Sequence, residues 1–279
     1  MSVVIGIDVG GSTTKIVGYT DKAKLVGMLK VEAADPLTSA YGALGKFINE
    51  HSLALADVKQ IILTGVGSAL FKKKVYGIPT STVDEFKAIG LGGLALSNKN
   101  EGLIVSMGTG TAFVRAGKKG IFHIGGSGVG GGTVLGLGSH LCGIKSFKNL
   151  VALAQKGKLN KVDLNIGDIS TRAISTLTKE ITASNFGKME DGLSQADLAA
   201  GVLNMVFQTI GMMAVFACRN EHMKDVILTG TLSQVPSAEK VFRMLHTMHG
   251  INFIIPKNAI YATATGAALS YLYRKERTK

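Results

Sequence analysis

The pattern of apolar positions divides the first part of the chain into strands followed by a helix. Residues 3–9, VVIGIDV, form a near-continuous β-branched run, which is typical of a strand buried on both faces. Residues 38–49 carry apolar side chains at helical spacing, and residues 58–64 return to a strand pattern. With two further strands at 14–19 and 25–33, this region predicts the element order β-β-β-α-β.

The second part of the chain repeats this pattern. Residues 83–96 predict a helix that begins with the acids Asp84 and Glu85, and the stretch GLIVSMGTGTAFVRAG from Gly102 again gives a strand, a turn of glycine and hydroxyl residues, and a strand. Two such hairpins that face each other across a cleft would hold the phosphates of a nucleotide from both sides. The remaining elements are expected as helices at 133–141, 147–156 and 194–218, a strand at 225–230, a helix at 237–248, a strand at 251–255 and a helix at 262–274.

The turn of the first hairpin has the residue types that phosphate binding needs. Gly10 and Gly11 permit positive φ and close backbone approach, so that successive N–H groups point at one anion. Asp8 ends the first strand, where it would hold Mg²⁺ on a triphosphate through water. The next four residues add hydroxyl donors and a cation: Ser12, Thr13, Thr14 and Lys15. An ordinary glycine-turn hairpin is the alternative. A P-loop is excluded, because GxxxxGK[ST] is missing and a strand follows the glycines.

A glycine-rich block, GGSGVGGG at residues 125–132, leads into the helix expected at 133–141. Its N–H groups and the helix N-terminus predict another anion site. The block contains the spelling GxGxxG, but the acidic residue that a dinucleotide-binding fold needs about 20 positions later falls in an interval without acids. We therefore reject the dinucleotide-fold interpretation.

Composition predicts a globular, cytoplasmic protein. The 279 residues are 46% hydrophobic, enough for a large core and for two domains, which we place at 1–100 and 101–279. The sequence has no uninterrupted apolar run of about 18 residues and no signal-peptide pattern at its start, so a membrane segment is not expected. Cys142 and Cys218 are the only cysteines and lack any metal-ligand spacing, so they are expected to be buried small hydrophobes.

The charge distribution favours an anionic small molecule. The formal net charge is +12, and the interval between Glu101 and Asp163 contains no acidic residue. A positive field therefore surrounds the glycine-rich middle of the chain. Nucleic acid is not an expected partner, because no tryptophan and no recognisable reading motif accompany the charge.

The order of elements resembles the actin, Hsp70 and sugar-kinase superfamily, and several motifs resemble the type II pantothenate kinases within it. The resemblance covers nearly the whole chain, and its most specific part is the glycine block followed by TASNFG. It implies an α/β fold of two related βββαβα-type domains with a nucleotide cleft between them. The motifs, in chain order, are DVGGSTTK from Asp8, DEF from Asp84, MGTGT from Met107, GGSGVGGGTVLGLG from Gly125, TASNFG from Thr182 and the closing TATGAAL.

The resemblance implies phosphorylation of pantothenate by ATP with Mg²⁺. Glu85 matches the catalytic base and Asp8 the residue that orients Mg²⁺ through water. Ser184 and Asn185 fall in the motif assigned here to substrate. The positions that would contact the nucleotide are Gly10, Gly11, Ser12, Thr13, Thr14, Lys15, Thr109, Gly110, Thr111, Gly131, Gly132, Thr133, Val134, Leu135, Phe147, Gly230 and Thr231.

One position departs from the family. His123 stands where family members carry an arginine that contacts substrate and the transferring phosphate. Histidine lacks the planar fork of five donors and is largely neutral near pH 7. Either Arg115, Lys118 or Lys119 supplies the missing charge, or the substrate or rate differs; the other interpretation is that His123 only packs beside Phe122.

Two other functions remain open from the sequence. One is an ATPase activator of a 2-hydroxyacyl-CoA dehydratase or benzoyl-CoA reductase, which needs cysteine ligands for an iron–sulfur cluster shared by two subunits. The other is a sensor that binds ATP or a CoA ester without turnover. A sugar kinase is weaker, because neither an NDxN-like loop nor a zinc motif is present. The long apolar helix at 194–218 and the family's dimers together predict a homodimer.

Overall fold

The first sheet is built from the predicted β-β-β-α-β unit. The computed structural model describes residues 2–11, 13–32, 35–71, 74–170, 178–188 and 190–276. Six strands lie in the order β3-β2-β1-β4-β6-β5, with β1 antiparallel to β2 and parallel to β4. Their bounds are β1 Val3–Val9, β2 Thr13–Thr20, β3 Leu25–Glu32, β4 Val58–Thr64, β5 Lys74–Val75 and β6 Ile78–Thr82.

The second sheet repeats the arrangement of the first. Its order β13-β12-β7-β8-β9 again places an antiparallel pair of hairpins on one side of the central strand and parallel strands on the other. The predicted repeat is therefore confirmed as a structural repeat. The strands are β7 Gly102–Met107, β8 Thr111–Gly117, β9 Gly120–Ser127, β12 Asp225–Thr229 and β13 Asn252–Ile254.

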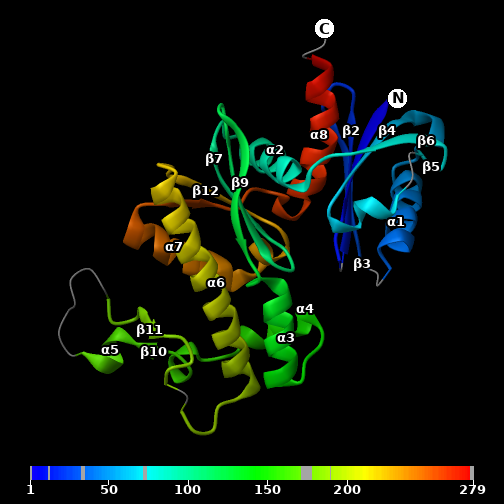
Figure 1. Ribbon diagram of the computed structural model, residues 1–279. Coiled ribbons are helices and arrows are strands. Elements are labelled where there is room, and N and C mark those ends of the chain that lie inside the picture. Colours follow the sequence, from blue (N-terminus) through cyan, green and yellow to red (C-terminus); the bar gives the residue numbers. More distant parts are fainter. Residues whose placement is uncertain are drawn as a thin grey trace.

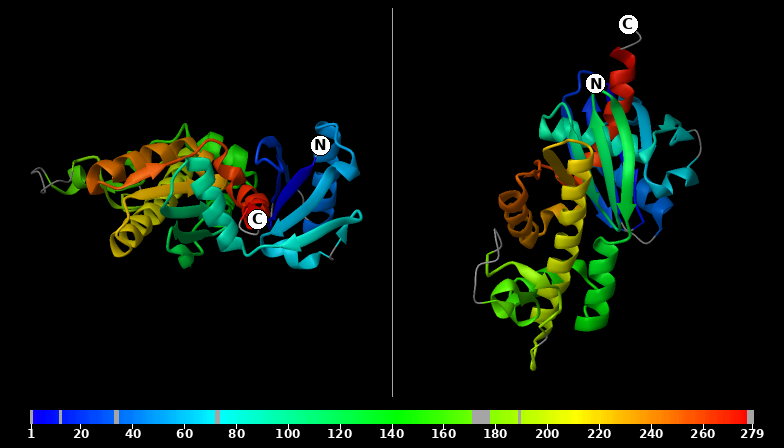
Figure 2. Two further views of the ribbon diagram at one scale, coloured as in Figure 1. Left: turned by 90° about the horizontal axis from the view of Figure 1, so that it is seen from above. Right: turned by 60° about the vertical axis from the view of Figure 1, so that its left-hand side comes forward.

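Helices cover both sheets and fill the space between them (Figures 1 and 2). Helix α1 packs on one face of the first sheet, α8 on the other face, and α2 lies between α8 and the second sheet. The outer face of the second sheet packs against α3, α6 and α7. The helices are α1 Pro36–Glu50, α2 Glu85–Ser97, α3 Gly131–Cys142, α4 Phe147–Ala154, α5 Ile166–Ile169, α6 Gln195–Asn220, α7 Pro236–His249 and α8 Ala262–Glu276.

Glycines let α2 and α8 cross in direct backbone contact. A Cβ added to Gly92 would lie 1.7 Å from the Ala262 carbonyl oxygen, and one added to Gly266 would lie 1.8 Å from that of Ala88. Gly6 of β1 is equally tight against α8, because its Cβ would lie 2.1 Å from the Ala264 oxygen. No other residue type fits these three positions without moving a backbone. The crossing joins the two sheets, with α8 returning from the end of the chain to the first sheet.

Helix α6 is the core helix of the second half. Its mean hydropathy reaches 1.7, and among the described residues it alone is long and apolar enough to cross a bilayer, yet 61% of that window is buried in the protein. The side chain of Asp197 fixes its start by accepting the backbone N–H groups of Lys158 and Ser194, and these bonds lower the pKa of Asp197 to about 2. Burial within one chain therefore explains most of the apolar surface that the sequence places around this helix.

The elements predicted from the sequence are present with small differences at their ends. The first strand and the strand at 58–64 have the predicted bounds, whereas the long helix runs from Gln195 to Asn220 and not only to Cys218. Ala33, the last residue of the third predicted strand, lies outside the described residues. Strand β9 and the short pair β10 Leu164–Asn165 and β11 Thr182–Ser184 were not predicted, because glycine in β9 and the shortness of β10 and β11 hide the strand pattern.

Candidate active site

A polar row crosses three strands of the first sheet at the end of β1. The pairing register aligns Asp8 with Lys15 on one side and with Thr64 on the other. All three are buried, and Lys15 Nζ lies 3.3 Å from Asp8 Oδ2. Alternation along β1 sends the odd-numbered residues, from Val3 to Val9, to the α1 face and leaves Val4 and Asp8 on the face toward α8 and the second sheet. The row therefore faces the space between the two halves.

The turn that follows β4 packs closely against Asp8 of this row. Gly65 has φ +85°, and a Cβ there would lie 2.7 Å from Asp8 Oδ1 and from the Val9 carbonyl oxygen. The predictions from the sequence did not place Gly65 in the site. The signal was available, because the sequence LTG at 63–65 recurs at 228–230, where Gly230 was assigned to the nucleotide.

The Gly230 turn of the second half has nearly the same geometry. Gly230 has φ +85° and ψ 177°, against φ +85° and ψ 167° at Gly65. A Cβ on Gly230 would lie 2.5 Å from the Met107 carbonyl oxygen at the end of β7. Each half therefore brings one LTG turn against the end of its own central strand, and Thr231 begins the short helix after the second turn.

Glu85 is the first residue of α2 and lies near Asp8. Asp84 caps the helix by accepting the Lys87 N–H at 2.9 Å, which fixes the first turn. Burial raises the pKa of Glu85 above its ordinary value, the nearby charges of Asp8 and Asp84 raise it further, and Lys15 lowers it. A half-buried carboxyl with a raised pKa beside a second carboxylate is a suitable general base.

His123 contacts the residue that follows this base in α2. Its ring stacks on the ring of Phe86, the residue after Glu85, with centroids 3.8 Å apart and planes 12° apart. His123 does pack against an aromatic ring, but the interpretation that this ring is Phe122 is wrong, because the stacking ring belongs to Phe86 of α2. His123 therefore connects the second sheet to the helix turn that carries Glu85.

The three cations considered as replacements for the family arginine lie elsewhere. Arg115 is paired with Glu221 at the end of α6, with Nε and Oε2 3.3 Å apart. Lys118 and Lys119 form the exposed turn between β8 and β9, at the opposite end of β8 from the glycine turn before it. This part of the expectation is wrong, since none of the three extends from the end of the sheet that carries the glycine turns.

The Gly10 turn is tight. The Gly10 N–H bonds to the Thr13 carbonyl at 3.1 Å, while Ser12 lies outside the described residues. Gly11 is exposed and Thr13 half-buried. Thr14 points the other way, because its hydroxyl accepts a bond of 2.9 Å from Ser39 under α1. The assignment of the Thr14 side chain to phosphate is therefore corrected: alternation along β2 puts Lys15 on the site face and Thr14 on the opposite face.

The glycine-rich turns of the second half bond mainly to each other. The N–H groups of Gly131 and Gly132 both donate at 2.8 Å, to the carbonyls of Gly108 and Thr109 respectively, and the Gly130 N–H bonds to Thr133 Oγ1 at 3.1 Å. The prediction of an anion site at this helix N-terminus is corrected accordingly, because its first donors are already used. The contacts instead hold the two turns together as one wall, with Thr109 exposed.

Several other residues predicted to contact the nucleotide have side chains that form hydrogen bonds or pack within the protein. Thr111 donates to the Val129 carbonyl at 2.8 Å, and Thr133 donates to the Gly128 carbonyl at 3.0 Å. Val134 is fully buried in the main core, and Phe147 packs against the same core. Gly110 and Leu135 remain half-exposed near the turns. The side chains of Thr111 and Val134 therefore shape the wall and do not reach a ligand.

Ser184 and Asn185 are not brought to Glu85 within one chain. Ser184 ends β11 and Asn185 follows it, and β11 lies on the far side of α6 from β1 and β2 (Figures 1 and 2). The Asn185 amide donates to buried Asp163 at 3.2 Å, and Asp163 also accepts the Phe186 N–H at 2.9 Å and the Asn204 amide at 2.7 Å. The substrate assignment of the Asn185 side chain is corrected, because it anchors its own loop; Ser184 is exposed.

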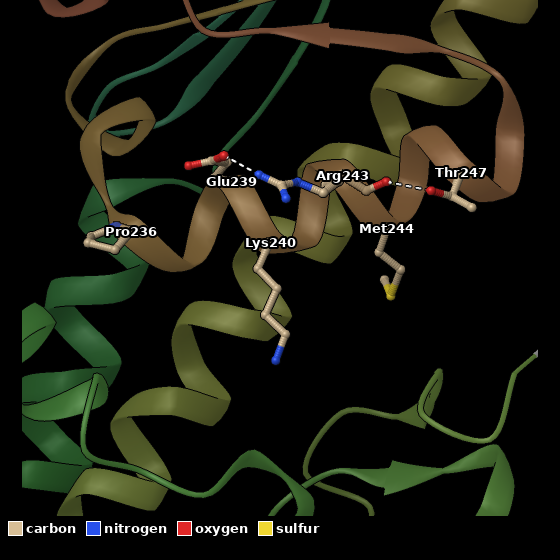
Figure 3. A pocket seen from close by; sticks show the side chains of 6 residues that line it. All are labelled: Pro236, Glu239, Lys240, Arg243, Met244 and Thr247. Atoms are coloured by element: carbon tan, nitrogen blue, oxygen red, sulfur yellow. Dashed lines mark hydrogen bonds and ion pairs between the residues drawn. The ribbon is translucent and has the colours of Figure 1, made fainter.

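The remaining cavities and thiols do not belong to this site. A pocket of about 470 Å³ lies along α7 and is lined by six of its residues, none of them a predicted site residue (Figure 3). Both cysteines are buried, as predicted, and burial raises the pKa of the Cys218 thiol to about 12. Within the described ranges, no three His, Cys, Asp or Glu side chains form a metal cluster. A single carboxylate at Asp8 fits Mg²⁺ held mostly by phosphate and water.

Known proteins resemble this chain over most of its length. The family described as Fumble matches residues 97–253, which is more than half of the sequence. The chain belongs to the Fumble family. A type II pantothenate kinase from Bacillus cereus is 29% identical over 248 residues, covering 83% of this chain and 84% of its own. One from Oceanobacillus iheyensis is 29% identical over 281 residues, covering 95% and 98%. The predicted resemblance is confirmed, and with it the enzyme class, a kinase that acts on a small molecule.

Solved structures confirm the fold class. Component A of the (R)-2-hydroxyglutaryl-CoA dehydratase from Acidaminococcus fermentans aligns with a TM-score of 0.70 at 18% identity, covering 99% of this chain and 100% of its own. The activator of the 2-hydroxyisocaproyl-CoA dehydratase from Clostridium difficile, solved with bound ADPNP, gives 0.70 at 15%, covering 99% and 96%. The ROK hexokinase from Thermus thermophilus gives 0.58 at 13%, covering 98% and 99%. At these identities the likeness concerns the fold alone.

Proposed function

We propose that this protein transfers the γ-phosphoryl group of ATP to the primary hydroxyl of pantothenate, the first step of coenzyme A synthesis, in the cytoplasm. The observation that carries the proposal is the position of Glu85, a carboxyl with a raised pKa next to Asp8 and Lys15 in the space between two glycine-turn walls. The family members named type II pantothenate kinase support the choice of acceptor.

Glu85 acts as the general base. Its carboxylate takes the proton of the attacking hydroxyl as the hydroxyl oxygen bonds to the γ-phosphorus, while the bond from that phosphorus to the bridging oxygen breaks and ADP leaves. The raised pKa keeps it basic enough for this transfer, and the capped first turn of α2 fixes its direction. Phe86 and His123, stacked beside it, restrict the space on the acceptor side.

Lys15 and Asp8 prepare the phosphate side. Lys15 provides positive charge for the phosphate oxygens, and Asp8 would hold Mg²⁺ through water. When bound, Mg²⁺ would neutralise charge on the triphosphate. The turns at Gly10 and Gly11, at Thr109 and Gly110 and at Gly230 enclose the nucleotide from both halves. Positioning and charge are what this reaction requires, since the protein forms no covalent bond to substrate.

The proposal is tested by pantothenate-dependent ADP release, with the product identified by mass spectrometry. Purified protein with Mg²⁺ and ATP is expected to form 4′-phosphopantothenate and an equal amount of ADP. Pantetheine and related alcohols are the matched acceptors. ADP release that no alcohol stimulates would contradict the proposal.

A sensor without turnover is the second candidate, favoured by one observation. His123 replaces the family arginine, and the structure brings neither Arg115, Lys118 nor Lys119 to the site in its place. Mg²⁺–ATP that raises the melting temperature without any product from an alcohol would favour this candidate. The dehydratase-activator function is disfavoured by the two buried cysteines, which are not available at a surface to ligate a cluster.

We further propose that the protein is a homodimer formed through α6. Phe216, 59% exposed, and the half-buried Met205 and Met212 lie along one face of this helix, and such an apolar strip fits a second copy. Light scattering is expected to give twice the chain mass. Phe216→Asp should give the monomer mass, while Leu141→Asp, an exposed apolar residue of α3, is the control that leaves the mass unchanged. A wild-type chain that scatters as a monomer would contradict this.

A further inference from the structure

Thr64 carries a buried hydroxyl that the fold leaves unused. The residue is fully buried at the end of β4, and its Oγ1 atom has no hydrogen-bond partner among the residues that the structure describes. A buried hydroxyl without a partner is destabilising, and valine fills the same space without that cost. A threonine at this position therefore calls for a reason outside the stability of the fold.

The hydroxyl belongs to the polar row of the site. Thr64 is the register partner of Asp8, and neighbouring strands lie about 4.8 Å apart, so the two side chains stand side by side on one face of the sheet. Asp8 Oδ2 is paired with Lys15 on its other side, and Gly65 limits the space around Oδ1. Rotation about the Cα–Cβ bond is enough to direct the Thr64 hydroxyl at the Asp8 carboxylate.

The equivalent threonine of the second half behaves differently. Thr229 is 1% exposed and precedes Gly230 as Thr64 precedes Gly65, but its Oγ1 lies 3.5 Å from the Val105 carbonyl, to which it donates. Its register partner is Ser106, not a carboxylate. The turn itself therefore does not require an unpaired hydroxyl. The difference between the two threonines follows the presence of Asp8.

We propose that Thr64 is a positioning residue. Its hydroxyl donates a hydrogen bond to the Asp8 carboxylate when Lys15 turns from Asp8 to the phosphate. In the part of the chain that the structure describes, Lys15 is the side chain that donates to Asp8. When a nucleotide draws Lys15 away, the buried carboxylate loses that donor, and the Thr64 hydroxyl replaces it. Asp8 then keeps a hydrogen-bond donor and its direction toward the phosphates. This inference rests on the proposed function, because it assumes that phosphate binds at Lys15.

The test compares Thr64→Val and Thr64→Ser with the control Thr229→Val. Without nucleotide, Thr64→Val should melt at or above the wild-type temperature, because the unpaired hydroxyl is gone. Thr229→Val should melt at or below it, because a bonded hydroxyl is lost. With pantothenate and Mg²⁺–ATP, Thr64→Val should lose about tenfold or more in kcat, as expected for a hydrogen bond to a charged group. Thr64→Ser should recover most of that loss, and Thr229→Val should stay within about twofold of wild type.

A second measurement separates this inference from the choice of acceptor. The rise in melting temperature that Mg²⁺–ATP causes should be smaller in Thr64→Val than in wild type and Thr64→Ser, whatever alcohol the enzyme uses. If the wild type forms no phosphopantothenate but this difference is found, the proposed function fails and the role of Thr64 stands. Equal nucleotide shifts in all four proteins, or a kcat for Thr64→Val equal to that of wild type, would overturn the inference.

Discussion

The two LTG turns have the same backbone and opposite chemical surroundings. Gly65 and Gly230 share φ +85°, and each presses on the end of the central strand of its own sheet. The first turn adjoins Asp8, which is close to Lys15 and Glu85, whereas the second adjoins a backbone carbonyl. The comparison teaches that each half of the repeated fold supplies one glycine turn of the cleft, while the carboxylates and the lysine of the site come from the first half.

This concentration of carboxylates has a thermodynamic cost. Asp8, Asp84 and Glu85 lie close together, and their repulsion adds to burial in raising the pKa of Glu85. Because the folded pKa is raised, the stability contribution of Glu85 is full below its ordinary pKa and is lost as the pH rises through the folded pKa. At neutral pH the catalytic half is therefore less stable than it would be without the charge on Glu85.

The largest expected effect comes from Glu85→Gln, which removes the base of the first half and leaves the second half unchanged. Glu85→Gln should lower kcat by roughly 10² or more, because a positioned base contributes on that order, while ATP affinity is kept. The melting temperature should rise relative to wild type as the pH rises above the ordinary pKa of a glutamate. Steady-state kinetics, calorimetric ATP titration and thermal scans from pH 4 to 8 measure all three, with Glu101→Gln, a distant exposed glutamate, as control. Turnover at the wild-type level would reduce Glu85 to a capping-turn acid.

A matched pair of glycine substitutions separates the functions of the two turns. Both alanine variants force a side chain into a glycine-only conformation, at a cost of roughly 1–3 kcal/mol each. Gly65→Ala should also displace Asp8 and lower kcat about tenfold or more, whereas Gly230→Ala should mainly weaken ATP binding. Denaturant melts and ATP titrations of both variants give the comparison. Losses of the same kind in both variants would show that the two turns do the same work.

His123 connects the halves, and its replacement should have a moderate effect. An arginine there is permanently charged and offers a planar fork of donors that histidine lacks, so His123→Arg should raise turnover several-fold near neutral pH. Phe86→Leu, which removes the stacking ring, should change the acceptor KM more than the ATP KM. If His123→Ala and His123→Arg both match wild type from pH 6 to 8.5, His123 is a packing residue.

The smallest effects on activity are expected at hydroxyls bonded within their own half. Thr14 accepts from Ser39, and Thr111 donates to the Val129 carbonyl. Thr14→Val and Thr111→Val should each cost about 1 kcal/mol of stability and leave the KM for ATP within twofold. Denaturant midpoints and ATP kinetics measure both. A tenfold change in the KM for ATP in Thr14→Val would instead show that the Thr14 side chain contacts the phosphates.

The sequence predicted the repeat because hydrophobic periodicity and glycine turns are local signals. Val3–Val9 and the stretch at 102–117 have the same pattern of strand, turn and strand, and the structure contains both. Asp8 and Lys15 lie in the first of these hairpins, and its register pairs them in the structure. The position of Glu85 relative to Asp8 followed from family resemblance, because their contact spans separate elements.

The sequence did not reveal which donors are free. The amides of Gly131 and Gly132 are used by Gly108 and Thr109, a contact between turns more than twenty residues apart. Thr13 and Thr14 are the same residue type, so the sequence does not distinguish them. Only the pairing register shows that Thr14 faces α1 and Thr13 faces the site. Asn185 was assigned to substrate although its amide binds Asp163, because a buried carboxylate on another segment leaves no local signal.

The central claim is that Glu85, in the charged half of the repeat, deprotonates an alcohol that receives phosphate from ATP. Single-turnover transfer of labelled γ-phosphate to pantothenate, followed in wild type and Glu85→Gln at equal occupancy by ATP, tests it most directly. The account predicts rapid transfer in the wild type and transfer slower by roughly 10² or more in the variant. Equal transfer rates in the two proteins would contradict it.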